Sequence, residues 1–230
     1  MYFRHSNEIW RDFPELVVGV LYADGVDTNL SVDPRIAKFN GIAEERLAAG
    51  PESELPEIQA WRRAFSRMGL KPTQYRCASE SLLRRFRKEG ALPRIHPLID
   101  LCNSISLAFA IPVAVLDAAQ ITEWVEVRYA SGTETYVTFA GEVENPEAHE
   151  VIFADNAGHA HARRWTNRQS AHSAVRDTTT AVLIVAEAMH DSASADVKRL
   201  VATIDDELQG AGSMAPKTAL LSQTSPQFEF

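Results

Sequence analysis

Cysteine is scarce in this chain of 230 residues, and long apolar runs are absent. The two cysteines, Cys77 and Cys102, are too few for a disulfide framework and lack the spacing of a metal site. No segment approaches the ~20 consecutive apolar residues that a membrane span needs, and residues 1–10 lack the apolar stretch of a signal peptide. We therefore expect a cytoplasmic protein, in a reducing compartment and with no membrane partner.

A general surplus of positive charge is also missing, because the chain has a net charge of -8. Residues 62–94 depart from this balance. They hold ten of the 23 Lys and Arg residues and two acidic residues, Glu80 and Glu89, so this basic segment carries +8. Such segregation predicts a surface for a polyanion, either phosphate or RNA. The alternative is a pair of solvated helices without a ligand.

The spacing of apolar residues divides the chain into a largely helical first half and a strand-rich second half. A β-branched apolar run at 15–26 predicts a buried strand, central in a sheet. Helical periodicity predicts helices at 34–49, 57–68, 79–90, 96–110 and 195–208. Short apolar runs bounded by turn residues predict strands at 113–117, 124–130, 135–140, 150–156, 159–165 and 178–189. This order indicates an α+β fold, with mixed or antiparallel sheets packed with helices.

No internal repeat or linker divides the chain. We therefore expect one domain over residues 1–209. The remaining residues, 210–230, are predicted to form a flexible C-terminal tail.

The predicted helix at 96–110 carries its polar side chains on one stripe. His96, Asp100 and Asn103 are spaced four and three residues apart and share a helix face, while the residues around them are apolar. The stripe is either an internal polar network or the wall of a pocket. Asp100 could equally anchor a neighbouring backbone loop.

A second polar group follows the glycine at position 158. His159 and His161 share one face of a predicted strand, but no third ligand or supporting carboxylate is placed, so we expect no metal site. Trp165, beside Asn167 and Arg168, offers a stacking surface for a nucleotide or an amino-acid ester. The alternative is that the indole fills the core.

The string LPRIHPLIDLCNSISLAFAIPVAVLD, residues 92–117, resembles the core motif of the B3/B4 editing domain in the β subunit of bacterial phenylalanyl-tRNA synthetase. Asp100, Asn103, Pro112 and Asp117 stand at the motif positions, and Cys102 stands where the synthetase has threonine. The resemblance extends over residues 79–187. The preceding residues look like the leader of free-standing members of this family.

The resemblance implies an α+β editing-domain fold and a tRNA-binding protein that hydrolyses wrongly charged aminoacyl-tRNA in trans, without aminoacylation activity. tRNA, through its aminoacylated acceptor end, is the expected partner, and an aminoacyl-tRNA synthetase is a further candidate. The chain departs from the motif at Ala114, where the family has histidine, and at 166–172, which replace a glycine-rich loop. A non-catalytic RNA-binding module and a small-molecule ester hydrolase or sensor therefore stay open.

Under this hypothesis each candidate residue has a role. Asn103 holds the ester or the amino group, Asp100 orients the helix, and His96 positions water. No cofactor is needed, since an aminoacyl ester is already activated and the neighbouring ribose hydroxyl can carry a proton. The predicted substrate contacts are Trp165, Asn167, Arg168, Cys102 and Ser79. The predicted RNA contacts are Arg76, Arg84, Arg85, Arg87 and Lys88.

Overall fold

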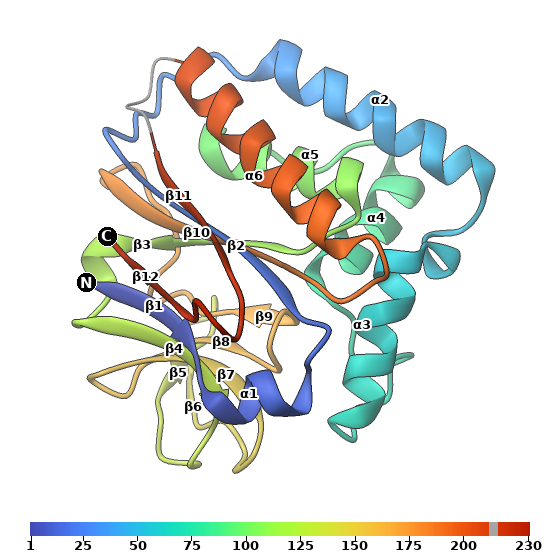
Figure 1. Cartoon of the computed structure of the whole chain (residues 1–230). Helices are drawn as coiled ribbons and strands as arrows, with labels where there is room; N and C mark the ends of the chain where they lie inside the picture. The colour runs from blue at the N-terminus through green and yellow to red at the C-terminus, as the bar shows by residue number, and fades with distance from the viewer. Residues whose placement is uncertain (212–215) are drawn as a thin grey trace.

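Two large β-sheets, a small two-stranded sheet and a layer of helices build the fold, as the computed structural model shows for residues 1–211 and 216–230 (Figure 1). The helices of these residues are α1 Asn7–Asp12, α2 Asp33–Ala49, α3 Pro56–Arg67, α4 Ala78–Glu89, α5 Pro97–Phe109 and α6 Ala193–Gly210. The strands are β1 Tyr2–His5, β2 Val17–Asp24, β3 Val113–Asp117, β4 Trp124–Tyr129, β5 Tyr136–Val137, β6 Val143–Glu144, β7 Val151–Asp155, β8 Ala160–Arg163, β9 Arg168–Gln169, β10 Ala181–Ala188, β11 Lys217–Leu221 and β12 Gln227–Glu229. The predicted α+β class is confirmed.

The four-stranded sheet has the order β11-β2-β10-β3, and its neighbouring strands are antiparallel. Its central strands are apolar on both faces because both faces are covered. On β10, Ile184 joins the core beneath α5 and α6, while Leu183 and Val185 join the core between the two sheets. Figure 1 shows α2 and α6 on the side of this sheet that faces away from the six-stranded sheet. The predicted central position of the first apolar run is confirmed.

Helix α6 lies very close to β2, and Gly19 makes this approach possible. A Cβ atom built on Gly19 would lie 2.4 Å from Val201 Cγ2 and 2.8 Å from Val197 Cγ1. Real Cβ contacts are longer, so with a larger residue either these valine side chains or the helix would have to shift. The glycine thus permits the close approach of α6 to the four-stranded sheet.

The six-stranded sheet has the order β12-β1-β4-β7-β8-β9 and packs against the other sheet. Phe3, Val127 and Phe153 of this sheet share one buried cluster with Leu183 and Val185 of the four-stranded sheet. This cluster is the core between the two sheets. It encloses the candidate site described below.

The five predicted helices are confirmed, with ends within two residues of the expected positions. Local signals explain this agreement: Pro97 lies in the first turn of α5, and Gly90 ends α4 with a left-handed φ of 74°. In the described residues, no helix combines the length and the apolar composition needed to cross a bilayer. The predicted strand at 135–140 is shorter than expected and comprises the two residues of β5.

The predicted C-terminal tail is wrong for the residues that the structure describes there. Strand β11 pairs with β2 over five residues, and β12 pairs with β1. Leu221 and Phe228 are buried in the core between the sheets. Residues 212–215 lie outside the described part of the chain. The alternation of buried and exposed residues in this segment is hard to detect in its polar composition, because edge strands expose one face to solvent.

A short hairpin, β5 with β6, supports the segment that contains β9. Tyr136 Oη donates a 2.8 Å hydrogen bond to Gln169 O, and Ala171 N donates to Val137 O at 2.9 Å. The loop before the hairpin is held by Glu134, whose carboxylate accepts from Ser131 N at 3.0 Å and lies 2.6 Å from an Arg128 nitrogen. Glu134 therefore secures the entry to β5.

This loop makes stability dependent on pH. Burial alone would raise the pKa of Glu134, but hydrogen bonds from Ser131 and Arg128 outweigh it and lower the pKa to about 2. A lowered carboxyl pKa stabilises the fold above pH ~4.5, and this contribution is lost as the pH falls toward 2. We expect Glu134→Gln to cost about 1–3 kcal/mol at pH 7 and much less at pH 3. Urea unfolding of both proteins at the two pH values measures this, and an equal cost at both would contradict it.

A candidate active site between the two sheets

A small pocket of about 60 Å³ lies between the two sheets, near the N-terminal end of α4. Its walls are mostly apolar, and its polar groups come from the connection after β8 and from the end of β10. The lining residues are Ala78, Pro112, Val113, Ala114, Phe153, Ala162, Trp165, Thr166, Asn167, Arg168, Gln169, Val185 and Glu187. We call this the inter-sheet pocket. An apolar cleft with a few convergent polar groups is the usual form of a small-ligand site.

An unusual backbone turn places one wall of this pocket. Arg164 and Trp165 both have positive φ, 47° and 58°, a conformation that costs side-chain-bearing residues on the order of 1–3 kcal/mol each. The turn is held in place because Arg164 N donates to Glu150 Oε1 at 2.9 Å and Trp165 N donates to Val151 O at 2.7 Å. The turn directs the Trp165 side chain into the core and places the next four residues along the wall of the pocket. Backbone strain of this kind is concentrated at functional sites.

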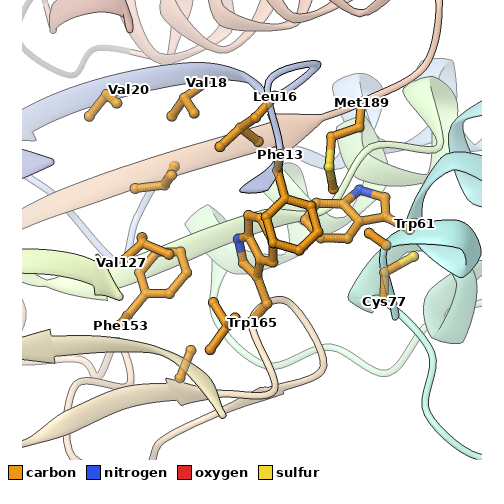
Figure 2. Packing of buried hydrophobic residues seen from close by; sticks show 14 of the residues in the cluster. Phe13, Leu16, Val18, Val20, Trp61, Cys77, Val127, Phe153, Trp165 and Met189 are labelled. Atoms are coloured by element: carbon orange, nitrogen blue, oxygen red, sulfur yellow. The ribbon is translucent and has the colours of Figure 1, made fainter. Parts of the chain in front are cut away.

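The predicted stacking role of Trp165 is wrong, and the alternative, that its indole fills the core, is correct. The side chain has no exposed surface. Figure 2 shows its ring beside Phe13 and Trp61. The contacts are edge to face, with centroid distances of 4.8 and 5.1 Å. The packing of Phe13 and Trp61 leaves no free ring face for a nucleobase, although Trp165 also borders the inter-sheet pocket.

Glu187 is a buried acidic residue in the pocket that was not predicted from the sequence. Its Oε1 accepts a 2.9 Å hydrogen bond from Trp165 Nε1 and lies 2.6 Å from His5 Nε2. Both neighbours are buried with it, since His5 and Glu187 are 2% exposed. A glutamate inside the otherwise apolar strand β10 is the signal that could have identified it, because a buried carboxylate needs partners.

Asn167, Arg168 and Gln169, which line the polar wall, are fixed by contacts with different elements. Asn167 Nδ2 donates to Arg76 O at 2.7 Å, and Gln169 Nε2 donates to Val115 O at 2.7 Å. Arg168 is more exposed and lies 3.5 Å from a Glu144 oxygen. The structure thus brings the predicted substrate contacts Asn167 and Arg168 to one pocket. Their roles stay predictions.

The predicted catalytic residues do not lie in the inter-sheet pocket. Asp100 and Asn103 line a separate pocket of about 240 Å³ between α2 and α5, which we call the α2–α5 pocket. Asp100 Oδ1 accepts a 2.9 Å hydrogen bond from Ile95 N, so it anchors the loop before α5, the alternative that the sequence left open. The structure therefore separates Asn103 from Asn167 and Arg168.

His96 lies at the N-terminal end of α5, where its Nδ1 accepts a 3.2 Å hydrogen bond from Leu98 N. Burial lowers the pKa of His96, which favours the neutral ring required for this cap. It is not among the lining residues of either pocket. The local role of His96 is therefore to cap the helix.

Two predicted substrate contacts lie in the core instead. Ser79 has no exposed surface and Cys102 is 2% exposed, and neither lines the two pockets. Burial raises the pKa of the Cys102 thiol to about 12, so the thiolate is not formed at neutral pH. The substrate-binding roles predicted for these two residues are wrong.

The basic segment is less positive in space than in sequence. Arg84 and Arg87 both pair with the buried Glu52, at 3.1 and 2.8 Å, and Glu52 lies outside the segment. Arg85 pairs with Glu89 at 2.9 Å, and Arg76 lies 3.4 Å from Glu80. A count of charges along the sequence could not include Glu52, because the fold brings it there. RNA binding by Arg76, Arg84, Arg85, Arg87 and Lys88 stays a prediction.

The histidines after position 158 form a cluster around Asp155. His159 Nδ1 lies 3.2 Å and His161 Nε2 3.5 Å from Asp155 Oδ2, and the His159 and His172 rings are stacked at 4.3 Å. Burial opposes ionisation of Asp155, but the neighbouring His161 ring and hydrogen bonds from His159 hold its pKa well below the usual range. Across residues 1–211 and 216–230, no group of three or more His, Cys, Asp or Glu is placed to hold a metal ion.

Comparison with known proteins connects this architecture to one family. A family model described as "B3/4 domain" matches residues 60–207. The phenylalanine–tRNA ligase beta subunits of two Haemophilus influenzae strains are 34% identical over 64 residues, which cover 28% of this chain and 8% of each subunit. The match thus spans a small part of these relatives.

A solved N-terminal fragment of the phenylalanyl-tRNA synthetase beta-subunit from Pyrococcus horikoshii aligns with 94% of this chain and 49% of its own length. The TM-score of this alignment is 0.49 and the identity is 11%. The alignment therefore covers about half of that fragment.

Proposed function

This chain belongs to the B3/4 domain family, and from this premise we propose that it hydrolyses the ester of wrongly charged aminoacyl-tRNA in the inter-sheet pocket. The observation that supports the proposal most is the strained Arg164–Trp165 turn. It directs Asn167, Arg168 and Gln169 along a pocket that also holds the buried carboxylate of Glu187. Strain that is retained beside a pocket favours a functional role for that pocket.

The pocket offers a distinct place for each part of an aminoacyl ester. Phe153, Ala162 and Val185 form apolar walls for the amino-acid side chain, with Glu187 as the polar group among them. Arg168, which is the most exposed of the polar lining residues, suits the phosphate or ribose of the terminal nucleotide. The ester bond would then lie beside the amide of Asn167.

Hydrolysis of an aminoacyl ester requires few catalytic groups from the protein. The oxygen of a water molecule bonds to the ester carbonyl carbon, and the bond from this carbon to the ribose oxygen breaks. One proton of the water passes to the ribose oxygen, which leaves as a hydroxyl group, and the free amino acid is released. Ala114, which lines the pocket where the family has histidine, supplies no base. Orientation of the water and proton transfer through the neighbouring ribose hydroxyl therefore carry the reaction.

The partner in this proposal is the acceptor end of tRNA, and an aminoacyl-tRNA synthetase is a second proposed partner. The basic segment on α4 would meet phosphates further along the tRNA. Since Arg84 and Arg87 share the carboxylate of Glu52 and Arg85 pairs with Glu89, part of their positive charge is compensated before tRNA binds. The contribution of this surface to affinity is therefore smaller than its sequence charge implies.

The test is deacylation of a panel of mischarged tRNAs by the purified protein, with Asn167→Ala and Asn103→Ala as a matched pair. We expect release of one or a few amino acids, and a loss of about 10–100-fold in kcat/KM for Asn167→Ala, or roughly 1.4–2.7 kcal/mol. We expect Asn103→Ala to change kcat/KM by less than about threefold. Urea unfolding of both variants controls for stability.

Two results would overturn this assignment. A large loss in Asn103→Ala, with Asn167→Ala unchanged, would place the reaction in the α2–α5 pocket. No release from any tRNA would reject the hydrolase, and binding of tRNA without turnover would then favour an RNA-binding module.

A further inference from the structure

We infer that the inter-sheet pocket selects a short amino-acid side chain that ends in a hydrogen-bond donor, such as the hydroxyl of serine or threonine, and excludes aromatic rings. This inference rests on the proposed function. It concerns the class of amino acid that the ester carries. The size of the pocket and the placement of Glu187 support it independently.

The volume of the pocket limits the side chain to a few heavy atoms. A cavity needs roughly 10–15 Å³ to hold one water, and an apolar cavity of about 150 Å³ in another protein is known to accept benzene. The inter-sheet pocket, at about 60 Å³, holds more than one water but less than an aromatic ring. A hydroxymethyl or hydroxyethyl group fits this space.

The walls cannot easily move apart to admit a larger group. Phe153 is 1% exposed and packs on Phe3 at a centroid distance of 5.9 Å, and Val185 is 1% exposed on the other sheet. Both residues belong to the core that joins the sheets, so a larger pocket would require the sheets to separate. The size limit is thus part of the fold.

The polarity of the pocket requires a donor on the ligand. The two side chains that contact the Glu187 carboxylate, His5 and Trp165, both do so at Oε1. No hydrogen bond from the described residues reaches Oε2. An apolar side chain such as that of alanine would displace water from this oxygen and leave it without a partner, whereas a hydroxyl would donate to it.

The experiment compares serine, alanine and tyrosine attached to the same tRNA. We expect seryl-tRNA to be hydrolysed at least tenfold faster than alanyl-tRNA, and tyrosyl-tRNA to be hydrolysed no faster than without protein. Glu187→Gln is expected to reduce the preference for serine over alanine, because it replaces the carboxylate by a neutral amide of similar size. Val113→Ala enlarges the pocket from the half-buried edge strand β3, and we expect it to increase hydrolysis of threonyl-tRNA relative to seryl-tRNA.

The outcomes separate this inference from the proposed function. Hydrolysis of tyrosyl-tRNA at the rate of seryl-tRNA, or equal rates for serine and alanine, would overturn the inference and leave the hydrolase standing. If no ester is hydrolysed, the proposed function fails, and calorimetry with stable amide-linked seryl and tyrosyl adenosine analogues decides the inference. Tenfold tighter binding of the seryl analogue would support it, and equal or reversed affinity would overturn it.

Discussion

A chain that ends after Pro216 is expected to lose its cooperative fold, although the removed residues resemble a tail in the sequence. The truncation removes β11 and β12, which cover the outer edges of β2 and β1. It also removes the buried side chains of Leu221 and Phe228, each worth about 1.5–3 kcal/mol. Together with the lost strand pairing, this approaches the 5–15 kcal/mol that stabilises a typical domain.

Soluble yield and the urea transition, followed by circular dichroism, measure the effect of this truncation. Exposure of the apolar edge of β2 should also make the truncated protein aggregate. Leu220→Ser and Leu221→Ser in the full chain provide a matched pair, because Leu220 is 41% exposed and Leu221 is 3% exposed. A truncated protein that unfolds cooperatively with nearly unchanged stability would show that the C-terminal strands are dispensable.

Trp165→Ala is expected to destabilise the protein by about 3–5 kcal/mol through loss of buried packing, with a further ~1–3 kcal/mol from the lost hydrogen bond to Glu187. The indole is fully buried between Phe13 and Trp61, and its Nε1 donates to Glu187 Oε1. Trp165→Phe retains part of the packing and removes the donor, so it should cost less. Equilibrium unfolding in urea gives both values.

Trp124→Ala is the control for this pair. Trp124 is half-buried and stacks on Tyr2 at a centroid distance of 6.3 Å, so its removal should cost far less. If the Trp165 and Trp124 substitutions cost the same, Trp165 does not anchor the core between the sheets. A cost of less than about 1 kcal/mol for Trp165→Ala would contradict its structural role directly.

The helices and the long buried strands could be predicted because their signals are local. Pro97 and Gly90 mark helix ends within a few residues of the structure they determine. The continuous apolar runs of β2 and β10 indicate that both faces of these strands are buried. The short strands β1, β9 and β12 have no such signal, since two to four residues do not establish a period. In addition, β1 and β12 pair with segments that are distant in the sequence.

The candidate site was predicted in part. Asn167 and Arg168 line the inter-sheet pocket, and their roles as substrate contacts stay predictions. For Trp165 the sequence left a stacking surface and core burial open, because the left-handed turn that buries it is not visible in its residue types. Asp100 and Asn103 share a helix face, as their spacing requires, yet that face lines the α2–α5 pocket. Helical spacing shows which side chains share a face, and it does not show what lies opposite.

Residue order alone therefore determined the α+β class, the helix positions and the resemblance to the B3/4 domain, because each depends on neighbours within a few turns or on an ordered motif. Tertiary structure alone decided that His5 meets Glu187, 182 positions away in the sequence, and that Glu52 pairs with both Arg84 and Arg87. It also decided that the C-terminal strands β11 and β12 form one edge of each large sheet. The physical reason is that strand pairing and burial of charge join distant segments, whose distance in space no local pattern encodes.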